Sequence, residues 1–143
     1  MKQYKVDLNV IAPKNIKEDE ICNMLNGITY FLEDKYIKNN ILWILDFELD
    51  KFLSIEEQIR IIVSHLDQFQ IKNMLTKGIK IIFDIQIYYD TYSCSFEIPC
   101  GILQNMNTML NNIELSFSLY PTDFDEEYSG DSNSSKITPT INE

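Results

Sequence analysis

Alternation between apolar and polar residues is the feature of this sequence that most restricts its fold. It runs through residues 4–10, 79–89, 92–98 and 113–120, and a continuous apolar start leads into alternation at 41–49. Successive side chains on a strand point to opposite faces, so each run predicts a strand with one buried side. We therefore predict about five strands, with 79–89 and 92–98 joined as a hairpin.

Three segments between these strands have helical spacing of their apolar residues: 16–28, 54–69 and 99–110. Asn15 is positioned to cap the first helix, with Gly27 as its terminator. The second begins with the capping box SIEE at 54–57, and a further turn from Ile71 to Leu75 is expected to end near Gly78. Residues 29–40 follow neither period and predict a loop.

The strand pattern also predicts the layers of the fold. Alternation in most strands implies one solvated sheet face, which favours a mostly antiparallel sheet with the helices on the other face. We predict a two-layer α+β domain over residues 1–121. Residues 122–143 are acidic and rich in Ser, Asp and Thr, and they predict a disordered tail.

Composition restricts the class of partner. The chain has 22 acidic and 12 basic residues and a net charge of −10, which argues against direct nucleic-acid binding and allows steering toward a basic protein. No apolar run approaches the ~20 residues that span a bilayer, and residues 1–10 do not resemble a signal peptide. Three cysteines without a CxxC pattern suit a reducing compartment. We expect a cytoplasmic protein that does not bind a membrane.

No combination of residues predicts catalysis. His65, the single histidine, falls at the boundary of the apolar face of its helix, Cys100 lies near the expected start of the third helix, and Trp43 has the parity of the core. The four glycines form no phosphate-binding loop, and the tail DFDEEYSGDS lacks a calcium-loop pattern. We therefore expect no enzyme activity, cofactor or metal. The alternative is an enzyme or small-ligand-binding protein that uses His65, Cys100 or Trp43 in a pocket.

The outward face of the sheet is the candidate binding surface. By parity it carries six carboxylates against Lys5 and Lys80, with tyrosines between them. Tyrosines of this kind are common at protein interfaces. The residues predicted to bind a partner are Asp46, Glu48, Asp84, Tyr88, Glu97, Glu114 and Tyr120.

Four stretches resemble a bacterial family, domain of unknown function 4279. They are the opening strand with IKEDEICNML, then LWILDFEL, LSIEEQIRIIVSHLDQF, and the closing LQNMNTMLNNIELSFSLY, so the resemblance spans about residues 1–120. Such families are similar to the immunity proteins encoded beside bacterial toxins. The resemblance implies a non-catalytic inhibitor that blocks a cognate basic toxin or effector domain. The alternative within the same class is a phage or mobile-element inhibitor of a bacterial defence system, and the sequence does not predict the oligomeric state.

Overall fold

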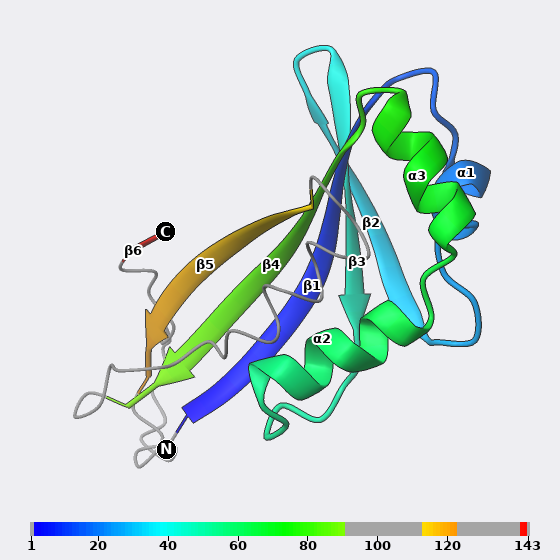
Figure 1. Ribbon diagram of the computed structural model, residues 1–143. Helices are drawn as coiled ribbons and strands as arrows, with labels where there is room; N and C mark the ends of the chain where they lie inside the picture. Colours follow the sequence, from blue (N-terminus) through cyan, green and yellow to red (C-terminus); the bar gives the residue numbers. More distant parts are fainter. Residues whose placement is uncertain (1, 91–112, 123–140, 143) are drawn as a thin grey trace.

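A single twisted sheet organises the chain (Figure 1). The computed structural model describes residues 2–90, 113–122 and 141–142. The strands are β1 (Lys2–Pro13), β2 (Tyr30–Ile37), β3 (Asn40–Phe47), β4 (Lys80–Tyr89), β5 (Glu114–Pro121) and β6 (Ile141–Asn142). Their order in the sheet is β2-β3-β1-β4-β5-β6, and all neighbours are antiparallel except β4 and β5, which are parallel.

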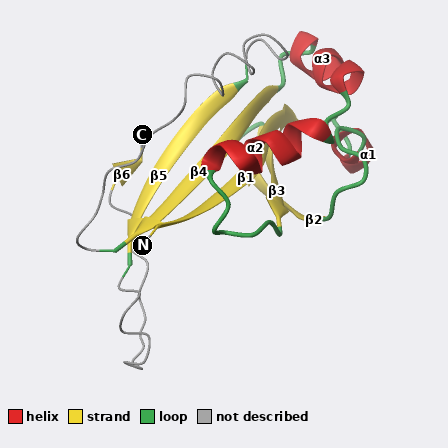
Figure 2. Cartoon of the chain, turned by 60° about the horizontal axis from the view of Figure 1, so that its bottom comes forward, coloured by secondary structure: helices red, strands yellow, loops and turns green. Residues whose placement is uncertain are grey.

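The described helices cover one face of this sheet (Figure 2). They are α1 (Glu18–Cys22), α2 (Ile55–Ser64) and α3 (Gln68–Thr76). The predicted α+β class, with a mostly antiparallel sheet and helices on one face, is confirmed. The helix expected over 99–110 lies outside the described residues, as does the strand expected over 92–98.

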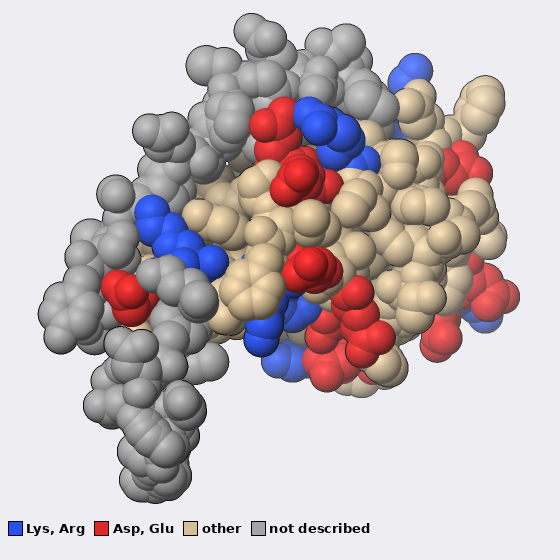
Figure 3. Space-filling model, turned by 90° about the horizontal axis from the view of Figure 1, so that it is seen from below, with Lys and Arg blue, Asp and Glu red and all other residues tan. Residues whose placement is uncertain are grey.

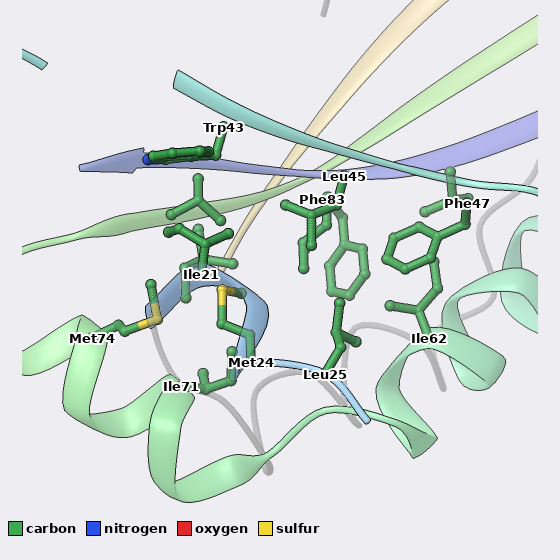
Figure 4. Packing of buried hydrophobic residues seen from close by; sticks show 14 of the residues in the cluster. Ile21, Met24, Leu25, Trp43, Leu45, Phe47, Ile62, Ile71, Met74 and Phe83 are labelled. Atoms are coloured by element: carbon green, nitrogen blue, oxygen red, sulfur yellow. The ribbon is translucent and has the colours of Figure 1, made fainter. Parts of the chain in front are cut away.

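Alternation places the core where the sequence predicted it. Every second residue is buried from Val6 to Ala12 on β1 and from Ile81 to Ile87 on β4, and Asp7 is buried between Val6 and Leu8. Figure 4 shows side chains of the sheet meeting those of all three helical regions in one cluster. Trp43 packs here with 6% of its surface exposed, which confirms its core assignment.

The predicted capping box of α2 is confirmed, but its helix is shorter than expected. The Ser54 hydroxyl accepts a hydrogen bond from the Glu57 N–H at 3.0 Å, and the Ser54 N–H donates to Glu57 at 2.9 Å. Helix α2 ends at Ser64, and α3 begins as a separate helix whose N-terminus is capped by the Asp67 carboxylate. Phe69, predicted to lie on the apolar face, is 88% exposed because the break reorients it.

The first helix was also predicted too long. It is capped at Lys17 rather than Asn15 and ends at Cys22. The cause is a backbone connection between residues 24–26 and the α2–α3 loop: Asn26 N–H donates to His65 at 3.0 Å, and Asp67 N–H donates to Met24 at 2.7 Å. Backbone groups used in this way cannot continue the helix.

The prediction of a loop over residues 29–40 is wrong, because most of this segment forms β2. Parity fails to identify this strand since it lies at the sheet edge and most of its residues are exposed on both faces. It also carries three consecutive charged residues, Glu33 to Lys35.

Residues 92–98, the second strand of the hairpin predicted with 79–89, lie outside the described residues, and the described neighbours of β4 leave no side of it for that pairing. Both sides of β4 are occupied, one by β1 and the other by the parallel strand β5. At the end of the predicted domain, the Thr122 N–H donates to Tyr89 at 2.7 Å. Beyond it, Ile141 and Asn142 pair with β5 as β6, whereas residues 123–140 of the expected tail lie outside the described residues.

Candidate protein-binding face

The sheet face opposite the helices carries a group of acidic and tyrosine side chains. We call six of these residues the acidic patch: Asp7, Asp46, Glu48, Asp84, Tyr88 and Tyr120. They come from β1, β4, β5, the end of β3 and the residue that follows β3. Parity sets this orientation, because each strand residue in the patch alternates with a core residue such as Phe47 or Ile85.

At one end of the sheet, β1 extends beyond the residues that pair with β3. Pairing between β1 and β3 begins at Leu8, so the backbone of Tyr4 and Val6 has no strand partner on that side. The buried side chain of Gln58 on α2 takes the place of a strand. Its amide nitrogen donates to the carbonyls of Tyr4 at 2.8 Å and Leu53 at 3.1 Å, and its oxygen accepts from the Val6 N–H at 3.2 Å.

Lys5 links the carboxylates of the patch. Its ammonium contacts Asp46, lies 2.9 Å from Asp7, and donates to the Phe47 carbonyl at 3.3 Å. Burial lowers the pKa of Lys5, but hydrogen bonds to the two aspartates outweigh it and leave the pKa above its ordinary value. The lysine therefore stays charged and holds both carboxylates in position.

Asp7 and Asp84 face each other directly across β1 and β4. Burial raises the pKa of both carboxyls, and the charge of Asp7 raises the pKa of Asp84 further. Gln86 relieves part of this repulsion, since its amide donates to Asp7 at 2.8 Å and to Asp84 at 3.3 Å. Asp7 is only 6% exposed, so Asp84 presents more of the pair's charge to a partner.

The two tyrosines form a stacked pair beside these carboxylates. Tyr88 lies opposite Tyr120 in the parallel register, and their ring centroids are 5.1 Å apart with planes 19° from parallel. The Tyr88 hydroxyl donates to Gln86 at 2.9 Å. Burial raises the pKa of Tyr88, as do nearby Tyr120 and aspartates, so the hydroxyl stays protonated and able to donate.

A pocket of about 390 Å³ opens at the same end of the sheet. Its walls include Lys5, Asp46, Glu48 and Tyr88, and Gln58 lies at the helix side. Figure 3 shows the molecule from below, where acidic and basic side chains are interspersed with uncharged surface. The end of the sheet is thus a mixed surface with local acidic character.

The structure brings together most of the predicted binding residues. Asp46, Glu48 and Tyr88 surround the pocket, Tyr120 stacks on Tyr88, and Asp84 joins them through Gln86. Glu114 lies six residues before Tyr120 on β5, about 20 Å away at the ordinary strand rise. It faces Lys80, with 3.7 Å between their charged groups.

Glu97 lies outside the described residues, and so does Cys100. The other candidates for chemistry have structural surroundings. His65 ends α2, and its Nδ1 lies 2.8 Å from the Asn26 carbonyl oxygen. Trp43 belongs to the core. Within the described ranges, no group of three or more His, Cys, Asp or Glu side chains is arranged to hold a metal ion.

Four residues of the site were not among the predicted binding residues: Lys5, Asp7, Gln58 and Gln86. Lys5, Asp7 and Gln86 have the same outward parity as the strand residues of the patch, so the alternation in the sequence indicates which face they occupy. Their roles depend on strand register, which sets the Asp7–Asp84 pair. Gln58 is flanked by buried Ile55, Ile59 and Ile62 on α2, and a polar residue on such a face is the signal that was missed.

Comparisons with known proteins add no identification. No protein-family model matches the chain, and neither a curated protein nor a solved structure matches it. The resemblance to domain of unknown function 4279 stays a prediction from the sequence. In the part of the chain that the structure describes, no helix has the length and hydrophobicity needed to span a bilayer.

Proposed function

We propose that the chain is a non-catalytic inhibitor that binds a basic protein, of the immunity type that blocks a cognate toxin or effector domain. The observation that carries this proposal is the acidic patch. Lys5 pairs there with Asp7 and Asp46, and a third aspartate, Asp84, lies opposite Asp7, next to a stacked pair of tyrosines. Uncompensated carboxylates favour a basic partner, and tyrosines are frequent energetic centres of protein interfaces.

The arrangement supports binding by pre-organised charge. Lys5 holds Asp7 and Asp46 in fixed positions, and Gln86 orients Asp84 and Tyr88. Side chains that are already ordered lose less entropy on association, so more of the interaction energy appears as affinity. Inhibition would follow from occlusion of the partner's active surface and from charge complementarity.

The first test is the association kinetics of the purified chain with the product of the neighbouring gene. Glu48 is exposed beside the pocket, so Glu48→Lys should slow association about tenfold and weaken its salt dependence. Tyr120→Ala should instead speed dissociation, because it removes a contact rather than a long-range charge.

Glu114→Lys is the matched control. It makes the same charge change on the same sheet face, but about 20 Å from Tyr120. It should alter association less than Glu48→Lys. Equal effects from both charge reversals would mean that net charge alone steers the partner, and unchanged kinetics in all three variants would remove the acidic patch from the proposal.

The alternative partner is a host defence protein, blocked by a phage or mobile-element inhibitor. The same patch serves both cases, since acidic side chains can occupy the site where a basic protein binds nucleic acid. Capture of a host protein, with no binding to the product of the neighbouring gene, would favour this alternative.

The pocket supports a second function, the binding of a small ligand. Its volume of about 390 Å³ falls in the range of small-molecule sites, and Lys5, Asp46 and Gln58 supply polar groups. Leu49 lies in its wall, so Leu49→Trp should fill the space. A ligand found by thermal-shift screening should lose affinity in this variant, whereas binding of a protein partner centred on Tyr120 should persist.

A further inference from the structure

We propose that two copies of this chain pair through the free edge of β2, in an antiparallel register with Asp34 of each copy at the two-fold axis. β2 is the last strand on its side of the sheet and pairs only with β3 among the described strands. This edge lies on the far side of β3 and β1 from β4. Phe31 on β2 pairs with Asp46 of the acidic patch, but the proposal uses only the outer edge of β2 and does not depend on the proposed function.

The edge of β2 is open to a partner. Phe31 is 57% exposed, Tyr36 is 72% exposed and Ile37 is 43% exposed, and the charged residues between them are exposed too. An eight-residue strand with one unpaired side is a template for strand addition. Large apolar side chains at both ends of such an edge indicate contact with another protein.

The turn between β2 and β3 determines which backbone groups face the edge. Ile37 and Asn40 pair directly across the two-residue turn Lys38-Asn39, so they form the hydrogen-bonded pair that closes it. Hydrogen bonding alternates along a strand, so the odd residues of β2 bond to β3. The N–H and C=O groups of Leu32, Asp34 and Tyr36 point to the free edge.

A second copy fits these groups in one symmetric register. If Asp34 pairs with its own copy, Leu32 pairs with Tyr36, and these even-numbered residues exchange the backbone hydrogen bonds. Glu33 then lies opposite Lys35, and Phe31 lies opposite Ile37, each pair occurring twice. Opposite charges and apolar side chains in directly opposed positions stabilise a sheet.

The neighbouring registers lack this complementarity. A two-fold axis at Glu33 places Glu33 against itself and Phe31 against Lys35. An axis at Lys35 places Lys35 against itself and Glu33 against Ile37. Charged residues in the centre of an edge strand normally oppose pairing, and only the register centred on Asp34 converts Glu33 and Lys35 into opposite-charge pairs. This self-complementarity argues for a second copy as the occupant.

The same register contains one unfavourable pair, Asp34 against Asp34. Like charges directly opposed across two strands are destabilising. The dimer should therefore be weak, with a dissociation constant on the order of 10–100 µM for so small an interface. Asp34→Asn should tighten it several-fold, because the neutral side chain keeps the backbone N–H and removes the repulsion.

The decisive experiment is sedimentation velocity of charge-reversal variants, alone and mixed. Glu33→Lys places a second lysine opposite Lys35, and Lys35→Glu places a second glutamate opposite Glu33, so each variant alone should dimerise about tenfold more weakly than wild type. An equimolar mixture of the two restores opposite-charge pairs, and so does the double variant. Both should recover dimers. Lys72→Glu, at an exposed position on α3, controls for the change in net charge that Lys35→Glu makes.

Asp34→Pro tests the backbone contribution. Its N–H points to the free edge, so proline removes no bond to β3 but blocks the symmetric pairing at the axis. This variant should keep the circular dichroism spectrum of wild type and sediment as a monomer. The proposal is overturned if wild type is monomeric at ~1 mM, if Asp34→Pro still dimerises, or if the mixture of the charge variants recovers no dimer.

Discussion

At the scale of single residues, Gln58 connects the helical layer to the sheet. Its amide satisfies three backbone groups where β1 extends past β3, and it is only 1% exposed. Gln58→Leu keeps a similar volume but leaves those groups unpaired, so it should lower the free energy of unfolding by about 2–4 kcal/mol.

Chemical denaturation measures this difference. Gln68→Leu is the matched control, because Gln68 is an exposed residue at the start of α3 and its change should stay within about 0.5 kcal/mol. Similar stabilities for the two variants would contradict the structural role assigned to Gln58.

Asp84 illustrates a residue that costs stability at the candidate site. Because burial and Asp7 raise its pKa on folding, the folded state holds a proton more readily than the unfolded chain. Its contribution to stability is therefore most favourable below the ordinary carboxyl pKa of 3.8 and declines as the pH rises through the higher folded value. At pH 7, Asp84→Asn should stabilise the fold by roughly 0.5–1 kcal/mol.

The pH dependence separates this effect from a general change in charge. The gain from Asp84→Asn should shrink as the pH falls toward 3.8, where the wild-type carboxyl becomes neutral. Urea denaturation at several pH values, with Glu114→Gln as an exposed control on β5, measures it. A gain that stays constant down to pH 3.8 would show that repulsion with Asp7 is not its source.

At the scale of elements, the turn between β2 and β3 contains one strained backbone conformation, which a glycine substitution should relieve. Lys38 has a φ of 55°, in the left-handed region that residues with a Cβ adopt at a cost. Lys38→Gly should raise the free energy of unfolding by about 0.5–1 kcal/mol. Its neighbour Asn39 lies outside that region, so Asn39→Gly should give no gain. Equal effects in thermal or urea unfolding would contradict the strain.

Elements also show which parts of the fold the sequence predicts. Alternation identified the buried rows of β1 and β4, because one buried face imposes a period of two. It missed β2, because an edge strand exposed on both faces has no such requirement. The α2–α3 break was missed because it depends on backbone bonds between residues 24–26 and the loop before Asp67, a contact between distant segments.

The candidate site, too, was predicted only where it depends on local alternation. Parity was sufficient to place Asp46, Tyr88 and Tyr120 on one face. Parity says nothing about register or strand order, and these put Asp84 opposite Asp7 and bring Lys5 to Asp46. They also leave Glu114 far along β5 from the tyrosine pair. Pairing between distant strands is a tertiary property that a local period does not encode.

At the scale of the whole molecule, the position of β1 has a consequence for how the chain acquires its structure. β1 lies inside the sheet, with β3 on one side and β4 on the other. During synthesis it emerges before the other strands, yet its second neighbour is complete only when Tyr89 has been made. The β2–β3 hairpin can form early, because its contacts are local.

β5 extends this delay, since a parallel strand beside β4 must be brought back to the end where β4 begins. Most of the sheet therefore depends on closing long loops before its contacts form, and such topologies fold slowly. Until β4 arrives, a nascent chain exposes the apolar row of β1 and one unpaired edge of that strand. Because β1 is central to the sheet, we expect the growing polypeptide to expose apolar surface that chaperones bind until β4 has been synthesised.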